Sequence, residues 1–213
     1  MYVKDIMTTN VVTVPSTTSI ADAKRIMQAH RFRRLPVVDR GKLVGVVTEH
    51  RLESVSPSKA TSLTVWEIGY LLEKTTVKEI MEKHLITVKP EMTVEEAISL
   101  SQENKVGALI VLEDGRVVGI LTTNDVFYKI VNKVLGIGSP GSRIEVSQAG
   151  EGKALEEVIS CVNKHGLKII TLHVIPPTEN GKNDLVVHVD SEDASKVVDE
   201  LKGKGYEVTL RKR

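Results

Sequence analysis

The chain has very little aromatic character and almost no cysteine. Phe, Trp and Tyr together make up 3% of its 213 residues, so the core must be built from Val, Ile, Leu and Ala. Cys161 is the only cysteine, which excludes a disulfide within the chain. The lack of a disulfide framework fits a reducing cytoplasm. We expect Cys161 to be a small core residue of a helix, and a reactive thiol is the less favoured interpretation.

Neither sign of charge dominates the sequence, and no apolar run is long. The formal net charge is +1, which produces no global field to attract nucleic acid or an acidic membrane. The longest apolar stretch, around Ala108–Leu112, is far too short to span a bilayer. The N-terminal residues show no basic region followed by an apolar one, so we expect no signal peptide. A cytoplasmic protein without a membrane partner is predicted.

The first half of the chain contains the same pattern twice, at an offset of 74 residues (77 − 3 = 74). No gap is needed anywhere when Val3–Leu52 is laid on Val77–Val126. Two copies of one structural unit normally stack to bury a shared apolar face, and a pseudo-symmetric groove forms where they meet. We therefore look for function in that groove. The clearest matching segments are Val3–Met7 with Val77–Met81, Leu35–Asp39 with Leu109–Glu113, and Gly41–Thr48 with Gly115–Thr122.

Each copy shows the same order of secondary-structure signals. A helix with N-cap candidates at Thr18–Ser19 or Thr93 is followed by two β-branched runs that meet at a Gly turn. A further helix is expected from about Thr48 in the first copy and from Thr122–Asp125 in the second. With a short first strand included, the predicted unit is β-α-β-β-α.

The segment between the copies predicts a loop and then an amphipathic connecting helix. Leu63, Trp66, Tyr70 and Leu71 recur at three- and four-residue intervals. We expect Trp66 to be a packing anchor, either in the core or in a dimer. Stacking of Trp66 on a ligand is the less favoured alternative.

The segment Leu135–Ser142 marks a boundary, because it contains three Gly, one Pro and two Ser and cannot continue a helix. It is not a phosphate loop, since it lacks the Gly-Lys-Ser/Thr ending and follows a helix. We interpret it as a hinge. The signals beyond it follow the order β-α-β-β-α-β, which is that of a ferredoxin-like sandwich. The fold class predicted for the whole chain is therefore α+β.

These motifs resemble the CBS domain pair, also called a Bateman module. The resemblance rests on the repeated Val-Lys-Asp/Glu-Ile-Met opening, on Leu35–Asp39 and on Gly119–Asp125, and it covers Met1 to about Val134. The tail from Ser142 resembles an ACT domain in element order, and the whole arrangement is similar to acetoin utilization regulatory proteins. The expected ranges are 1–62 for the first CBS repeat, 63–76 for the connecting helix, 77–135 for the second CBS repeat, 136–142 for the hinge and 143–213 for the ACT-like domain.

In the CBS family the cleft between paired units commonly holds an adenine nucleotide, so the resemblance implies such a site here. Asp125 would accept hydrogen bonds from both ribose hydroxyls, and Thr122 would face a phosphate at the helix N-terminus. Gly107 and Ala108 are small enough to let a ring approach the backbone. Alternatively, Asp125 is a plain N-terminal helix acid. The implied nucleotide-binding residues are Ile86, Thr87, Val88, Gly107, Ala108, Leu109, Thr122, Asn124 and Asp125.

The first copy departs from this pattern at Arg51, which is equivalent to Asp125 (51 + 74 = 125). Arginine carries donors only, so a ribose clamp is not expected there. Arg51 would instead reach a phosphate or pair with a surface acid. We expect one good nucleotide site and one poor or altered site.

The run His30–Arg34 is the only dense basic cluster. It is interpreted as a phosphate contact in the groove or as a solvated face, with nucleic-acid binding ranked well below both. Strand alternation would put Arg33 and Arg34 on opposite faces. The candidates for a second or phosphate site are Thr13, Arg33, Arg34, Thr48 and Arg51.

No motif of a nucleophilic or metal enzyme is present. His173 and His188 lie on two candidate neighbouring strands, but without a third ligand we expect no metal site. We predict a non-enzymatic, homodimeric sensor that needs no cofactor and takes an adenosyl regulatory ligand (AMP, ADP, ATP or S-adenosylmethionine). The alternatives are a structural dimerisation scaffold with degenerate pockets and an accessory protein of acetoin catabolism. The ACT-like tail suggests an amino-acid ligand or dimerisation through sheet edges.

Overall fold

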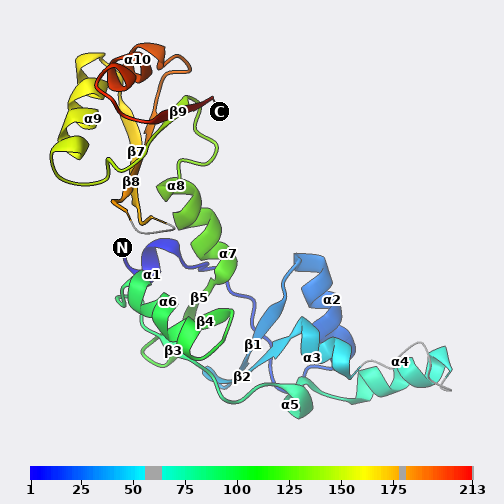
Figure 1. The fold of residues 1–213 in the computed structure, drawn as a ribbon. Helices are drawn as coiled ribbons and strands as arrows, with labels where there is room; N and C mark the ends of the chain where they lie inside the picture. Colours follow the sequence, from blue (N-terminus) through cyan, green and yellow to red (C-terminus); the bar gives the residue numbers. More distant parts are fainter. Residues whose placement is uncertain (56–63, 178–180, 213) are drawn as a thin grey trace. The chain divides into compact units, whose positions relative to one another are not determined.

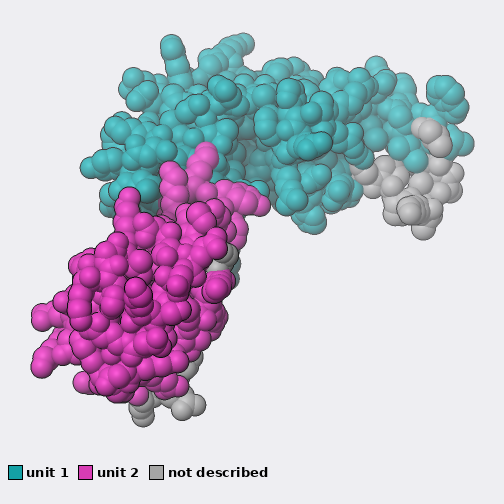
Figure 2. Space-filling view, turned by 90° about the horizontal axis from the view of Figure 1, so that it is seen from above, with its two compact units in different colours: residues 1–126 teal, residues 127–213 magenta. Residues whose placement is uncertain are grey.

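The computed structural model describes residues 1–55, 64–177 and 181–212. The chain divides into two compact units, Met1–Val126 and Phe127–Arg213, which Figure 2 colours separately. The first unit contains both copies of the repeat, and the second contains the C-terminal domain. The finer domain ranges expected from the sequence stay predictions.

The first copy of the repeat is a β-hairpin with helices around it (Figure 1). Its first strand is reduced to an isolated parallel bridge between Val14 and Val37. Ile20, Ala23 and Met27 are buried against the hairpin, as their helical spacing predicts. The elements of this copy are α1 (Val3–Ile6), α2 (Ile20–His30), β1 (Arg34–Asp39), β2 (Lys42–Thr48) and α3 (Glu49–Ser54).

The second copy repeats this arrangement and keeps its first strand. β3 pairs in parallel with β4, which pairs antiparallel with β5. Each hairpin turns on two residues with positive φ, Arg40–Gly41 and Asp114–Gly115, the left-handed backbone that a tight hairpin requires. The elements are α5 (Val77–Ile80), β3 (Thr87–Val88), α6 (Val94–Glu103), β4 (Ala108–Glu113), β5 (Arg116–Thr122) and α7 (Thr123–Val126).

Hydroxyl residues begin the main helices of both copies, as the sequence predicts. The Ser19 hydroxyl accepts the Asp22 N–H at 3.0 Å. Thr93 Oγ1 accepts the Glu96 N–H at 3.3 Å, and the Glu96 carboxylate accepts the Thr93 N–H at 3.1 Å. Hydrogen bonds from Thr93 also lower the pKa of Glu96. Such reciprocal caps satisfy N–H groups that have no partner inside the helix, which fixes where each helix begins.

The opening helix of the first copy is held by the second copy. The Val3 N–H donates to the Met92 carbonyl at 2.9 Å. Thr8 forms an antiparallel bridge with Ile120 of β5, through N–H···O bonds of 2.9 and 3.0 Å. The arm formed by residues 1–8 therefore completes the structure of the other repeat.

The second copy returns the same contacts. The Val77 N–H donates to the Thr18 carbonyl at 2.8 Å, and Glu82 forms an antiparallel bridge with Val46 of β2. Residues 76–82 thus form an equivalent arm on the first repeat. The two repeats are joined by an exchange of arms, in addition to the packing of their faces.

A methionine at the end of each arm lies on a glycine of the opposite hairpin. Met7 covers Gly119, and Met81 covers Gly45. A Cβ atom on either glycine would collide with the methionine side chain. The pair of glycines, one in each copy at the 74-residue offset, therefore allows both arms to dock closely.

α4 (Val65–Lys74) is the connecting helix that the sequence predicts. It begins with a capping box between Thr64 and Glu67, and its Leu72 packs against the core of the first copy. Trp66 is 89% exposed, so the expectation that it packs into the core is wrong. At 3.6 residues per turn, Trp66 and Leu72 lie on different sides of the helix. Leu63 lies outside the described residues.

In the second unit, four strands form one sheet in the order β7-β8-β6-β9, and each neighbouring pair is antiparallel. The order β-α-β-β-α-β matches the sequence pattern; its identity as an ACT domain stays a prediction. A π-helical turn (Phe127–Val131) and α8 (Asn132–Val134) precede it. The elements are β6 (Ser142–Val146), α9 (Gly152–Lys164), β7 (Ile169–Ile175), β8 (Asp184–Val189), α10 (Ser195–Gly203) and β9 (Val208–Lys212).

The core of the second unit lies between the sheet and the two helices α9 and α10 (Figure 1). Cys161 is buried there beside Val158 and Leu201, so the prediction that it is a core residue of a helix is confirmed. His173 and His188 lie on the neighbouring strands β7 and β8, as predicted, and His188 is buried.

Candidate functional site

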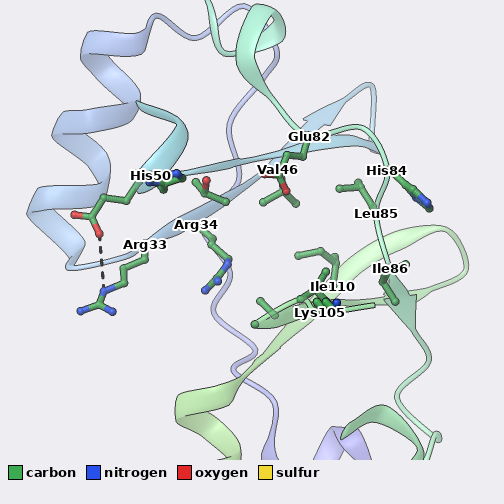
Figure 3. A pocket seen from close by; sticks show the side chains of 15 residues that line it. Arg33, Arg34, Val46, His50, Glu82, His84, Leu85, Ile86, Lys105 and Ile110 are labelled. Atoms are coloured by element: carbon green, nitrogen blue, oxygen red, sulfur yellow. Dashed lines mark ion pairs between the residues drawn. The ribbon is translucent and has the colours of Figure 1, made fainter. Parts of the chain in front are cut away.

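A cavity of about 390 Å³, here called the first cavity, lies between the two copies of the repeat. The first copy contributes the end of β2 and the start of α3, and the second contributes the segments around Ile86 and Gly107. Figure 3 shows Arg34 extending from β1 toward the strands of the second copy. The lining residues are Arg33, Arg34, Val46, Thr48, Glu49, His50, Glu82, His84, Leu85, Ile86, Lys105, Val106, Gly107, Ala108 and Ile110.

A second cavity, of about 500 Å³, also lies between the copies. Here the second copy contributes the end of β5 and the start of α7. The first copy contributes its basic run and Thr8 of its arm. The lining residues are Thr8, Arg31, Phe32, Arg33, Arg34, Gly107, Ile120, Thr122, Thr123 and Asn124.

The two cavities are related by the 74-residue repeat. Every residue of the second cavity lies 74 positions from a residue that lines the first, so that Thr122 corresponds to Thr48 and Thr8 to Glu82. Both volumes fall in the range of roughly 300–1,000 Å³ that small-molecule sites occupy. The duplication therefore builds two equivalent hollows from non-identical residues, which gives them different chemistry.

Arg33, Arg34 and Gly107 line both cavities. Arg33 Nε lies 3.8 Å from Glu49 Oε2, the ion pair drawn in Figure 3. A methyl group on Gly107 would lie 3.0 Å from the Arg34 guanidinium, so Arg34 reaches across to the second copy. Because β1 begins only at Arg34, strand alternation does not govern Arg33. The expectation that the two arginines lie on opposite sides is not met, because both line the same two cavities.

Asp125 is 8% exposed, and its carboxylate accepts several hydrogen bonds within the protein. Oδ2 accepts from the Thr122 backbone N–H at 2.9 Å and from the Thr122 hydroxyl at 2.6 Å. Oδ1 accepts from the Thr8 hydroxyl at 3.0 Å, across from the exchanged arm. A ligand hydroxyl that binds Asp125 must therefore share or replace these donors.

Arg51 occupies the equivalent place in the first copy, and its chemistry is reversed. Its Nε lies 3.4 Å from Glu82 Oε1, where Glu82 is the equivalent of Thr8 (82 − 74 = 8). Thr48 Oγ1 accepts the Arg51 N–H at 3.3 Å, as Thr122 Oγ1 accepts that of Asp125 at 3.2 Å. The interpretation that Arg51 pairs with an acid is confirmed. Beside the first cavity, the position equivalent to Asp125 therefore carries a cation in place of a carboxylate.

The nine residues named for a nucleotide from the sequence are not gathered in one cavity. Ile86, Gly107 and Ala108 line the first cavity, whereas Gly107, Thr122 and Asn124 line the second. Gly107 joins the two groups. Among the described residues that line these two cavities, Thr87, Val88, Leu109, Asp125, Thr13 and Arg51 do not appear.

Most of the predicted site residues that line neither cavity lie close behind the cavities or on another side of the sheet. Leu109 is buried and lines a smaller hollow of about 220 Å³ together with Gly107 and Thr122. Thr87 and Val88 belong to β3 and line an open hollow on a different side. Asp125 contacts the second cavity through its bonds to Thr122, which lines it.

Sequence reasoning missed much of the lining, although the repeat offset could have found part of it. His50 is equivalent to Asn124 (50 + 74 = 124), and Glu82 is equivalent to Thr8. The other missed residues lie beside predicted ones or come from the segment after α5. The missed residues are Thr8, Val46, Glu49, His50, Glu82, His84, Leu85, Lys105, Ile110, Ile120 and Thr123.

One cluster in the second unit carries atoms of the types that bind metals. The side chains of Cys161, His165 and Glu200 each offer an atom within 4.8 Å of the others. Glu200 Oε2 already lies 2.9 Å from both Lys164 Nζ and His165 Nε2, and these partners lower the pKa of Glu200 to about 2. Burial raises the pKa of the Cys161 thiol, which keeps it protonated and a poor ligand. We assign the cluster to an ion-pair network.

Residues 3–56 and 77–132 each match the family model of the CBS domain. The chain belongs to the CBS domain family. The two matches coincide with the two copies of the repeat, so the tandem CBS arrangement within an α+β fold is established. The two cavities between the copies are thus the hollows of a CBS pair.

Solved CBS pairs superpose on this chain. The CBS domain pair of protein MJ0100, in complex with 5′-methylthioadenosine and S-adenosyl-L-methionine, is 29% identical with a TM-score of 0.51 and covers 62% of this chain and 98% of that one. CBSX2 in complex with AMP is 30% identical with a TM-score of 0.50, covering 62% and 96%. A putative acetoin utilization protein (AcuB) from Vibrio cholerae is 30% identical with a TM-score of 0.53, covering 64% and 94%.

The chain spans about a fifth of the length of some curated relatives that it matches. An inosine-5′-monophosphate dehydrogenase from Korarchaeum cryptofilum is 37% identical over 121 residues, which is 56% of this chain and 22% of that protein. The likeness therefore extends to about half of this chain and to a minor part of the dehydrogenase. Within the described ranges, none of the helices has the length and apolar character needed to cross a membrane.

Proposed function

We propose that the chain is a regulatory, non-enzymatic protein that senses an adenosine-containing ligand, such as AMP, ADP, ATP or S-adenosylmethionine, in the groove between its CBS domains. The observation that carries this proposal is the pair of cavities related by the repeat, with the Asp125 carboxylate bonded to the lining residue Thr122 at one of them and the cation Arg51 at the equivalent position of the other. Solved CBS pairs in complex with AMP or with S-adenosyl-L-methionine support the ligand class.

The second cavity is the proposed main site. The ribose lies toward Asp125 and Thr122, because an ionised carboxylate accepts from both hydroxyls of a ribose. The base lies beside Gly107, where a larger residue would fill the space now next to Arg34. Phosphate groups, where the ligand has them, lie near the guanidinium groups of Arg33 and Arg34, which pair well with phosphate oxygens.

Binding at Asp125 gives a physical route to a change in packing. Thr8, which donates to Asp125, belongs to the exchanged arm of the first copy. A ribose that takes over this acceptor weakens one contact of the arm, and a ligand shifts such an equilibrium only by its differential affinity for the two states. The ligand thereby alters the packing of the repeats, and through it that of a dimer or of the domains.

The alternative from a different class is a structural dimerisation scaffold with degenerate pockets. The internal hydrogen bonds of Asp125 and the ion pair of Arg51 with Glu82 favour it, since both polar positions are satisfied without a ligand. A role as an accessory protein of acetoin catabolism is supported only by the likeness to the putative acetoin utilization protein.

Calorimetric titration of the full chain with AMP, ADP, ATP, S-adenosylmethionine and adenosine separates these proposals. The sensor proposal expects saturable heat with at least one adenosyl ligand and none with GMP. GMP has the same ribose and phosphate as AMP but a different base. If no adenosyl ligand binds, the sensor proposal fails and the dimerisation-scaffold proposal remains.

For the C-terminal domain we propose a ferredoxin-like ACT domain, supported by its strand order. An amino-acid ligand has less support at Ala149–Leu155, the segment that leads into the first helix of this domain and lacks the proline that ACT domains usually carry there. Gly150 is needed there for close contact with the backbone of Asn183 and Asp184, so protein atoms already occupy the space beside it. Thermal melting of the full chain with each of the twenty amino acids tests this, and an unchanged Tm throughout argues for a purely structural domain.

A further inference from the structure

The connecting helix α4 presents apolar residues on two opposite sides. One side packs on the first copy through Leu72, and Ile68 on the same side is half-buried. The other side carries Trp66, Tyr70 and Glu73, which at about 100° per residue point away from the packed side. A surface helix normally has a single apolar stripe, so a second one calls for a partner.

The outer side is strongly exposed. Trp66 is 89% exposed and Tyr70 is 62% exposed, and they are one turn apart on α4. Leu71, which flanks them, is 46% exposed. Trp66 is the only tryptophan of a chain with just seven aromatic Phe, Trp and Tyr residues (2 + 1 + 4). Large aromatic side chains are rarely left in water in the unpartnered state, and Trp and Tyr are the residues that interfaces favour.

The same side of α4 contains the features that would receive these side chains. Lys74 lies at the C-terminal end, with its Nζ 5.7 Å from the centre of the Tyr70 ring. Glu67 lies at the N-terminal end, and hydrogen bonds from Thr64 lower its pKa, which keeps it ionised.

We propose that this side of α4 is an interface between two copies of the chain, packed antiparallel across a two-fold axis near Tyr70. The charges favour a second copy as the occupant. In an antiparallel pair, Lys74 of one helix approaches Trp66 and Glu67 of the other, which gives a cation–π contact and an ion pair twice over. A two-fold interface of this kind requires a self-complementary surface, which α4 has.

The proposed interface is independent of nucleotide binding. A helix of ten residues buries less than the roughly 1,200 Å² of a stable complex. We therefore expect reversible association with a Kd on the order of micromolar or weaker. The dimer should form without any added ligand.

The tryptophan fluorescence of this chain comes from Trp66 alone, so it reports directly on the proposed interface. The test is the fluorescence spectrum and the acrylamide quenching of the ligand-free full chain from roughly 1 to 500 µM, alongside sedimentation equilibrium. We expect the emission to shift to the blue, and the quenching to fall at least two-fold, over the concentrations at which the mass doubles. A monomer at all concentrations, or a dimer whose Trp66 stays fully quenchable, overturns the proposal.

Variants locate the interface. Tyr70→Glu is expected to abolish association while retaining the helical circular dichroism, since Tyr70 is 62% exposed. Lys74→Glu should weaken association at least ten-fold, and Tyr70→Ala should do the same. Tyr128→Ala is the matched control, because Tyr128 is 63% exposed and lies outside α4. Association that survives Tyr70→Glu, or that is lost equally in Tyr128→Ala, assigns dimerisation to another surface and overturns the proposal.

Discussion

Arg51 and Asp125 occupy equivalent positions in the two CBS domains, and each binds the side chain that the opposite arm presents at the same point. Asp125 accepts from Thr8 at 3.0 Å, and Arg51 lies 3.4 Å from Glu82. The geometry of the contact is retained while donor and acceptor change places. The duplicated fold therefore tolerates a reversal of charge at this position, and the reversal makes the two cavities chemically different.

Restoring the carboxylate in the first copy should create a second binding site. In Arg51→Asp combined with Glu82→Thr, the first copy acquires the acceptor and the arm hydroxyl of the second copy. We expect calorimetry to report an additional molecule of adenosyl ligand per chain. The new site should be the weaker one, since Arg33 stands where the second copy has Gly107 (33 + 74 = 107).

The single substitution Arg51→Ala is the control for this variant. It removes the ion pair with Glu82 but supplies no acceptor, so the stoichiometry should stay that of the wild type. An unchanged stoichiometry in the double variant, with retained fold and retained first site, would show that Asp125 is not what makes the second copy competent.

Removal of the Asp125 carboxylate should weaken the main site. Asp125→Ala deletes a charged acceptor, and we expect a loss of about 1–3 kcal/mol in ligand binding free energy. Titration calorimetry of both proteins at equal ionic strength gives the difference. Asp125→Asn keeps the size of the side chain and one oxygen that can accept from Thr122. Its ligand affinity should therefore lie between those of the wild type and Asp125→Ala. Equal affinities in all three would remove Asp125 from the site.

Substitution of Gly119 should loosen the exchanged arm. In Gly119→Ala the added methyl group meets the Met7 side chain, and we expect unfolding to become easier by about 1–3 kcal/mol, as in other overpacked contacts. Chemical denaturation followed by circular dichroism measures the change. The double variant Gly119→Ala with Met7→Ala should cost less than the sum of the two single changes, because the collision is removed.

Gly69→Ala is the control for Gly119→Ala, because it adds the same methyl group elsewhere in the first unit. This glycine is in a helix and a Cβ there meets nothing, so alanine should stabilise by up to about 1 kcal/mol through helix propensity. A loss of stability in Gly69→Ala as large as that in Gly119→Ala would argue against the collision as the cause.

The second unit should show a pH dependence that is traceable to Glu200. Its pKa is lowered from 4.5 to about 2, chiefly by Lys164 and then by His165. A depressed carboxyl pKa stabilises the fold above the unfolded value, and this contribution is lost as the pH falls from about 4.5 toward 2. Glu200→Gln should lower the Tm near neutral pH, and the difference from wild type should shrink at about pH 3. Glu156→Gln, an exposed acid on α9, should show no such convergence.

Local signals explain how much of this fold could be predicted. The Gly turns of both hairpins, the hydroxyl caps at Ser19 and Thr93, and the helical spacing of Ile20 and Met27 each act within a few residues. The duplication then doubles every such signal. Element order, the CBS pair and the burial of Cys161 were predictable for this reason.

What could not be predicted depends on contacts between distant segments. Thr8 and Asp125 are 117 positions apart, and nothing in either motif says which copy an arm will pack on. Trp66 was misjudged because spacing shows that a helix has an apolar side, without showing which of two apolar sides meets the core. The split of the nucleotide residues over two cavities has the same origin, since it is set by how the copies face each other.

The exchange of arms has a consequence for how the module can be divided. Each CBS domain carries the arm (residues 1–8 or 76–82) that completes the structure of the other domain. Neither half of the pair is therefore a complete folding unit in isolation. Separately produced halves should recombine into one particle when mixed, whereas either half alone should seek the missing segment in another molecule of its own kind and form an intertwined pair.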